Sequence, residues 1–188
     1  MSLVMFSAGN HPQQVDARGA ADDIDDRETH PSMFDAWDRR FGGFTVDVAA
    51  AEHNTKCARF FTREQDGLTQ SWAGERVWCN PPYSSIGPWV EKAWREWPST
   101  RGIVMLLPAN RTEQSWWQDY VEPRRDRPGS PLTVEFLRGR LRFLKPGQTV
   151  IGPNQRPPFG CVLLIWADPQ WQVGAERAQA LFGEGAIA

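Results

Sequence analysis

The feature that most constrains the fold is an uninterrupted apolar run, Gly102-Ile103-Val104-Met105-Leu106-Leu107, which ends at Pro108. Polar residues do not alternate with apolar ones in this run, so both faces of the strand that it predicts must be buried. Strands buried on both faces are typical of parallel sheets that helices cover from two sides. The run therefore favours an α/β fold with this segment at the centre of the sheet.

The segments on either side predict strands that alternate with helices. Strands are expected at residues 44–50, 57–62, 75–79, 134–137, 140–143 and 161–166, and helices at 32–41 (capped by Ser32), 86–97 and 112–121. This alternation predicts a mostly parallel sheet, and the two short strands around Gly139 predict a hairpin that adds an antiparallel edge strand. In such sheets ligands bind beyond the carboxyl ends of the strands.

Length and composition restrict the domain organisation. The chain has 188 residues and a net charge of −2, which suits one domain of a soluble globular protein. Residues 1–28 carry six Asp and Glu against two Arg and show no periodicity, so they are expected to form a flexible acidic arm ahead of a single domain at 29–188. No apolar run approaches the roughly 18 residues that span a bilayer, which excludes a membrane protein.

Cysteine spacing argues against a metal or disulfide framework. Cys57, Cys79 and Cys161 form no C-x-x-C pair, so they are expected to be buried thiols in a reducing compartment, with no metal site. The ten tryptophans do not by themselves distinguish core packing from base stacking. Trp116 and Trp117 are adjacent on a predicted helix and point about 100° apart, so one can be buried while the other faces a cleft.

Positive charge collects in the second half of the chain. Residues 101–160 hold ten Arg and Lys against five Asp and Glu, which permits a polyanionic partner. Arg138, Arg140 and Arg142 alternate on a predicted strand and share one face, which is either a solvated surface or a contact with a DNA backbone. Arg111 and Thr112 open a predicted helix, where they either bind a phosphate or cap that helix.

The segment with the clearest chemistry is Asn80-Pro81-Pro82-Tyr83, which follows a predicted strand and precedes a predicted helix. The Asn80 amide oxygen and the Pro81 carbonyl oxygen both accept hydrogen bonds, proline has a fixed φ, and Tyr83 offers a flat ring. Two acceptors and a stacking face suit a planar group with an exocyclic –NH2. Acceptors outside the ring plane stabilise the positive charge that develops on such a nitrogen during methyl transfer. A plain strand-to-helix turn with a buried tyrosine is the alternative.

Several segments together resemble the phage-type, Dam-like DNA N6-adenine methyltransferase family. The resemblance extends over about residues 29–166 and rests on Val46 to Ala50, Asp66-Gly67-Leu68, Trp72, Val77 to Ser84, Leu107 to Thr112, Trp116-Trp117, Phe136 to Phe143 and Pro158-Phe159. It implies a Rossmann-like fold and an S-adenosyl-L-methionine-dependent enzyme that methylates adenine N6 in double-stranded DNA. It also implies a phage- or prophage-encoded protein in the bacterial cytoplasm, as a monomer or homodimer.

The resemblance implies roles for particular residues. Asn80, Pro81, Pro82 and Tyr83 would form the catalytic loop that receives a flipped adenine. The cofactor would be bound by His30, Pro31, Phe34, Asp47, Ala49, Asp66 and Asn80, with Asp47 near the methionine amino group and Asp66 near the adenine. DNA would contact Arg111, Thr112, Arg138, Arg140 and Arg142.

Two departures and three alternatives accompany the resemblance. Asp47-Val48-Ala49-Ala50 stands where methyltransferases of this fold carry a Gly-rich loop, and only Glu52 and Glu64 are candidates for the acid that holds the cofactor ribose. Because Asn-Pro-Pro-Tyr also occurs in methyltransferases that act on RNA or on protein glutamine, those substrates are alternatives. A DNA-binding relative without activity is the third.

Overall fold

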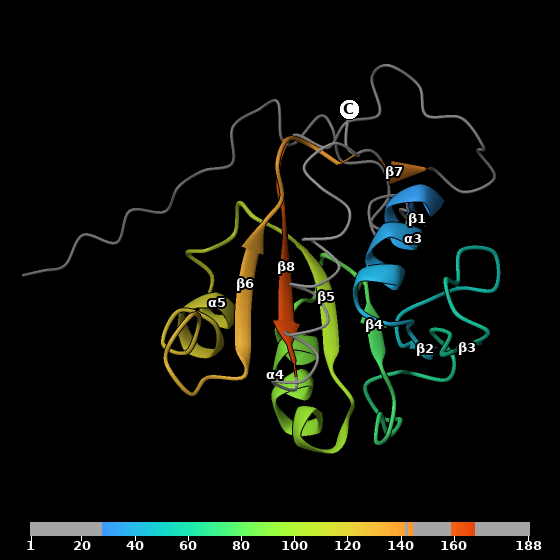
Figure 1. Cartoon of the computed structure of the whole chain (residues 1–188), viewed down its shortest axis with the longest axis horizontal. Helices are drawn as coiled ribbons and strands as arrows, with labels where there is room; N and C mark the ends of the chain where they lie inside the picture. Colours follow the sequence, from blue (N-terminus) through green and yellow to red (C-terminus); the bar gives the residue numbers. More distant parts are fainter. Residues whose placement is uncertain (1–27, 142, 145–158, 168–188) are drawn as a thin grey trace, which may run out of the picture.

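The computed structural model describes residues 28–141, 143–144 and 159–167, which include a six-stranded sheet (Figure 1). The strand order is β3-β2-β4-β5-β8-β6. The strands are β2 (Val46–Asp47), β3 (Arg59–Phe60), β4 (Val77–Cys79), β5 (Ile103–Pro108), β6 (Leu132–Phe136) and β8 (Cys161–Trp166). Apart from Glu28, the predicted acidic arm lies outside the described residues.

The sheet is mixed and mostly parallel, as predicted. The strands β3, β2, β4 and β5 pair in parallel, whereas β8 runs antiparallel to both of its neighbours, β5 and β6. The edge strand β6 therefore pairs antiparallel with β8, and β8 is the one strand of the six that runs opposite to the others. The fold class is confirmed as α/β with an antiparallel pairing at this edge.

The predicted hairpin around Gly139 is wrong. Strand β7 (Phe143–Leu144) does not return to β6 but pairs with β1 (Glu28–Thr29) in a separate two-stranded sheet. Gly139 has a φ of +75°, a conformation that turns the chain sharply and ends the strand pairing. Arg138 and Arg140 consequently lie exposed in a bend rather than on a strand, and Arg142 lies outside the described residues.

Helices cover both faces of the sheet. On one face α4 (Gly87–Glu96) and the short α5 (Ser115–Tyr120) pack their tryptophans against Ile103, Met105 and Leu107. On the other face α3 (Pro31–Arg40) packs against Val104 and Leu106. All of β5 is buried, which confirms that the apolar run forms a central strand covered from both sides.

The ends of helices α3 and α4 differ by a few residues from the predicted ends. The N-cap of α3 is His30, whose Nδ1 accepts the Ser32 N–H at 3.3 Å, because Pro31 fits the first helical turn and brings the start forward. The predicted 86–97 helix ends at Glu96 and continues as a 3₁₀ turn at Trp97–Ser99. Within the part of the chain that the structure describes, no helix has the length and apolar character needed to cross a bilayer.

Candidate functional site at the carboxyl ends of β2 and β4

The candidate site lies where the connections of the sheet diverge. Strand β2 pairs with β3 on one side and with β4 on the other, so the chain crosses over β2 between them. Asp47 is the last residue of β2, and Asn80 follows the last residue of β4. Open α/β sheets bind ligands at such a point, because the loops leaving the two strands turn away from each other and leave a crevice.

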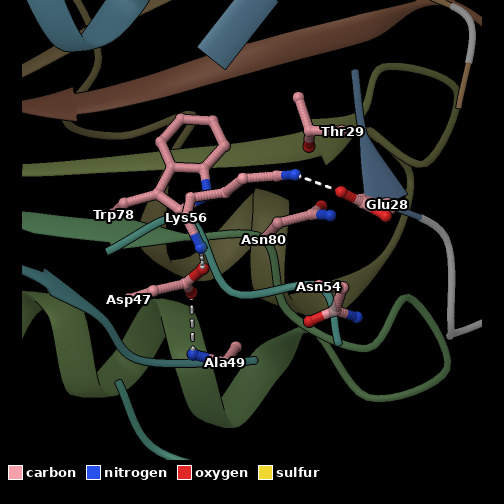
Figure 2. Close-up of a pocket in the computed structure, with 8 residues that line it drawn as sticks. All are labelled: Glu28, Thr29, Asp47, Ala49, Asn54, Lys56, Trp78 and Asn80. Carbon is pink, nitrogen blue, oxygen red and sulfur yellow. Dashed lines mark hydrogen bonds and ion pairs between the residues drawn. The ribbon is translucent and has the colours of Figure 1, made fainter. Parts of the chain in front are cut away.

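A small polar cavity of about 30 Å³ occupies this point (Figure 2). Three residues predicted for the site line it, namely Asp47, Ala49 and Asn80. Its remaining walls come from Glu28, Thr29, Asn54, Lys56 and Trp78. The structure therefore brings together strand-end residues that are far apart in the sequence.

Asp47 is a buried carboxylate held by backbone donors. Its side chain accepts the Ala49 N–H on Oδ1 at 3.3 Å and the Lys56 N–H on Oδ2 at 3.1 Å. Burial raises the pKa of Asp47 to about 6, and these two hydrogen bonds together with the positive charge of Lys56 limit the rise. Such a carboxylate is well suited to accept hydrogen bonds from a cationic ligand group.

An ion pair that the sequence did not predict lines the cavity. The Lys56 ammonium lies 2.5 Å from a Glu28 carboxylate oxygen, and both side chains are largely buried. Figure 2 shows this pair beside Asn80 and Thr29. The Thr29 hydroxyl is buried and has no hydrogen-bond partner among the described residues. Glu28 reaches the cavity because β7 holds β1 there, a pairing that no local sequence pattern indicates.

The Asn80–Tyr83 loop connects β4 to α4, as predicted. Pro81 and Tyr83 are buried, whereas Asn80 and Pro82 are half-buried. The Tyr83 ring packs edge-on against Phe159, with centroids 6.1 Å apart and planes at 64°. The ring is therefore held in place by a neighbouring aromatic side chain that precedes β8.

Arg111 contacts this loop. Its guanidinium Nη1 donates a hydrogen bond to the Tyr83 backbone carbonyl. The α5 helix is N-capped at Gln114 and begins at Ser115, so of the two alternatives for Arg111 and Thr112 the structure excludes capping of this helix. The Gln114 N–H bonds the Arg111 carbonyl at 3.2 Å, which makes residues 111–114 a turn ahead of the helix.

Other predicted cofactor residues lie outside the cavity. Asp66 is exposed with a φ of +49°, and its Oδ1 accepts the Leu68 N–H at 3.1 Å, so it acts as a turn residue. Phe34 packs its ring 5.4 Å from that of Trp78, on the core side of the site. His30 and Pro31 form the start of α3.

Neither candidate for the ribose-binding acid lines the cavity with Asp47. Glu52 lines a separate depression of about 350 Å³ beside β3, together with Arg59, Phe60 and Thr62. Glu64 is exposed, and a hydrogen bond with Thr62 lowers its pKa.

The adjacent tryptophans and the three cysteines lie in the core. Trp116 and Trp117 are both buried, so the expectation that one faces a cleft is wrong. The three cysteines are buried and free, and burial raises the pKa of Cys57 and of Cys161 to about 12, which leaves them unreactive thiols. Within the described ranges, no group of three His, Cys, Asp or Glu is placed to hold a metal ion.

The sheet order and the cavity at the strand crossover define an α/β protein with a candidate ligand site at the carboxyl ends of its strands. Comparison with known families shows which family of α/β proteins the chain belongs to. The chain belongs to the DNA N-6-adenine-methyltransferase (Dam) family, whose model matches residues 18–179. The resemblance inferred from the sequence segments is thereby confirmed.

Two curated relatives carry the same name. The chain is 36% identical over 140 residues to the DNA N-6-adenine-methyltransferase of Escherichia phage T1, an alignment that covers 67% of this chain and 56% of the relative. It is 50% identical over 65 residues to that of Haemophilus phage HP1, which covers 34% of this chain and 38% of the relative. The chain thus spans about half or less of the length of these relatives.

Among solved structures, the chain is similar to a candidate RNA methyltransferase from Pyrococcus horikoshii. The TM-score is 0.43 and the identity 11%, over 73% of this chain and 81% of the other. A likeness at this level carries no argument about function.

Proposed function

We propose that this protein transfers a methyl group from S-adenosyl-L-methionine to N6 of adenine in double-stranded DNA. The observation that carries the proposal is the Asn80–Tyr83 loop at the carboxyl end of β4, with Asn80 lining the same cavity as the buried Asp47. Membership of the Dam family supports it. Both curated relatives are phage proteins, which supports the further proposal that the chain acts in the cytoplasm of a bacterial host.

The polar groups around the cavity fit the amino-acid end of the cofactor. The cofactor's ammonium group matches the buried Asp47 carboxylate, and the cofactor's carboxylate matches the Lys56 ammonium and the Thr29 hydroxyl. The Lys56–Glu28 ion pair forms part of the cavity wall, so the cofactor carboxylate would compete with Glu28 for the Lys56 ammonium. When bound, the cofactor supplies an electrophilic methyl group.

The Asn80–Tyr83 loop would hold the acceptor amine. The Asn80 side-chain oxygen and the Pro81 carbonyl oxygen accept the two N–H groups of adenine N6, and the Tyr83 ring packs on the base. These contacts favour a pyramidal nitrogen and stabilise its growing positive charge, so they act more strongly in the transition state than in the ground state. After transfer, the nitrogen loses a proton to solvent.

A basic bend next to this loop supports a DNA substrate. We use "basic bend" for residues 138–140, which carry the exposed Arg138 and Arg140. The Leu137 N–H bonds the Cys161 carbonyl at 3.0 Å, so the bend leaves the sheet close to Phe159 and thus to Tyr83. Arginines at this place suit the phosphates that flank an adenine flipped out of a duplex.

The decisive test compares Asn80→Ala with the wild-type protein. We expect calorimetry to show nearly unchanged cofactor binding, whereas methylation falls by about a hundredfold or more because an electrostatic contact to the reacting amine is lost. Methylation by this variant at the wild-type rate would contradict the proposal.

The same assay separates the alternative substrates. Tritiated cofactor is offered with DNA, RNA and protein in parallel, and only DNA is expected to become labelled. Label in RNA or on protein glutamine would assign those substrates instead, and the absence of cofactor binding would favour a DNA-binding relative without activity. Sequencing DNA from expressing cells for N6-methyladenine would then locate the recognition site.

A further inference from the structure

The side chain of Arg111 reaches from one strand end to the next. It follows β5, and its guanidinium donates to the backbone carbonyl of Tyr83, in the loop that follows the adjacent parallel strand β4. The side chain is half-buried, so this hydrogen bond is only partly exposed to competition from water. Hydrogen bonds from a charged donor are roughly twice as strong as those between neutral groups.

This contact determines the orientation of the peptide group that carries Tyr83. Proline fixes φ at Pro81 and Pro82, which removes part of the rotational freedom of the loop ahead of Tyr83. A donor that holds the Tyr83 carbonyl oxygen restricts the rotation that remains. The backbone from which the aromatic ring extends is therefore restrained by Arg111.

The ring is held from its other end by Phe159, and the two holding groups are themselves connected. The Ala109 N–H bonds the Gly160 carbonyl at 2.9 Å, which fixes the segment carrying Arg111 to the segment carrying Phe159. Tyr83 is thus held at its carbonyl and at its ring by two segments that share a hydrogen bond. Such a closed arrangement favours a single loop conformation.

We propose that Arg111 is a positioning residue for methyl transfer, which acts by fixing Tyr83 through its backbone carbonyl. This inference rests on the proposed function, and it differs from the simpler role of a phosphate contact. A phosphate contact would affect the binding of DNA, whereas a positioning contact affects the turnover of DNA that is already bound.

Kinetics of Arg111→Ala and Arg111→Lys test the role. We expect kcat at saturating DNA to fall by about 10- to 100-fold in Arg111→Ala, the loss that removal of one charge-assisted hydrogen bond produces, with unchanged cofactor binding. Arg111→Lys retains one donor and is expected to recover part of kcat. Arg101→Ala is the matched control, because Arg101 is exposed at the opposite end of β5 and should leave kcat unchanged.

Amide hydrogen exchange gives a readout that needs no activity. Peptides that cover residues 80–90 are expected to exchange faster in Arg111→Ala than in the wild type or in Arg101→Ala, while peptides from β8 are unchanged, which shows that the fold is intact. If the wild type transfers no methyl group, the proposed function fails, but the exchange result still decides whether Arg111 holds the loop. Unchanged kcat with a raised KM for DNA, or unchanged loop exchange, would overturn the inference.

Discussion

Gly67 occupies a position where the backbone leaves no room for a side chain. A Cβ atom there would lie 2.0 Å from the Val48 carbonyl oxygen and 3.2 Å from the Trp89 ring. The Gly67 carbonyl accepts the Trp72 indole N–H at 3.0 Å, so the loop is fixed on this side as well. Gly67 thus lets the Asp66–Leu68 turn pack directly on the residue that follows Asp47.

Substitution of Gly67 by alanine is therefore expected to destabilise the protein. Backbone would have to move to relieve the clash, which costs about 3 kcal/mol in the free energy of unfolding. Gly74→Ala is the control, because its Cβ would meet no atom within 4 Å and only its φ of +76° opposes alanine, at about 1 kcal/mol. Urea denaturation measures both values, and equal losses would contradict the steric argument.

Under the proposed function, the raised pKa of Asp47 would make cofactor binding depend on pH. Burial favours the protonated acid, so the contribution of Asp47 to stability is complete below the ordinary pKa of 3.8 and is lost as the pH rises through about 6. Binding of an ammonium group has the opposite dependence, because it needs the ionised carboxylate.

Cofactor affinity is accordingly expected to fall when the pH is lowered through about 6, by up to tenfold per unit below it. Calorimetric titration at about pH 7.5 and about pH 5 measures the change. Asp47→Asn should bind weakly at both values, and a wild-type affinity that does not change with pH would exclude Asp47 as the partner of the ammonium group.

Residues at strand ends could be predicted from the sequence, whereas those that contact them over long distances could not. Asp47 and Asn80 follow apolar segments, and strand ends meet at one edge of a parallel sheet. Lys56 pairs with Glu28 only because β7 positions β1. Asp66 lies in a turn, as the Asp-Gly pair indicates, and its predicted contact with the cofactor stays a prediction.

Helix α4 carries a buried charge that holds a loop in place. Lys92 is 5% exposed, lies 3.2 Å from Glu96 one turn later, and has its ammonium 5.0 Å from the centre of the Trp72 ring. Glu96 also accepts the Trp72 backbone N–H at 3.0 Å. One carboxylate therefore both neutralises the buried lysine and anchors the segment next to β4.

Removing the two charges separately should have unequal effects on stability. Glu96→Ala leaves Lys92 buried without a counter-charge and is expected to cost about 3 kcal/mol, whereas Lys92→Met replaces a buried ion with an apolar chain and is expected to cost about 1 kcal/mol or less. Thermal and urea unfolding of both variants test the difference. A larger loss for Lys92→Met would show that the cation–π contact dominates instead.

Elements inside sustained apolar segments could be predicted, whereas the pairing of the short strands β1 and β7 could not. The segments that became β5, β8 and α4 have sustained apolar patterns, so their positions were predicted to within a few residues. β1 and β7 have two residues each, too few for a periodic signal, and their pairing replaced the expected hairpin. The predicted 112–121 helix lost its first turn because residues 111–114 form the separate turn that carries Arg111.

At the scale of the whole molecule, the strand order brings several segments to one end of the sheet. The Asn80–Tyr83 loop follows β4, and Arg111 follows β5. Phe159 precedes β8, and the basic bend follows β6. Because β8 runs in the opposite direction, its beginning lies beside the ends of β5 and β6. The exposed arginines and the proposed base site therefore share one edge.

Binding of DNA is expected to weaken with salt, and the basic bend should contribute to this dependence. Replacing Arg138 and Arg140 together by alanine should reduce the slope of log affinity against log salt by about two, one for each phosphate contact. Fluorescence anisotropy with a labelled duplex measures the slope. An unchanged slope would place both arginines in solvent, away from the DNA.

Strand β8 also determines when the sheet can form during synthesis. It pairs with β5 along all six of its residues and is the strand partner that β6 has in this sheet. Ribosomes add about 5–20 residues per second. The edges of β5 and β6 that pair with β8 therefore stay unpaired for seconds, until residues 161–166 emerge. A nascent chain that stalls before this point exposes the unpaired edges of two strands, of which β5 is apolar throughout, and such edges favour aggregation.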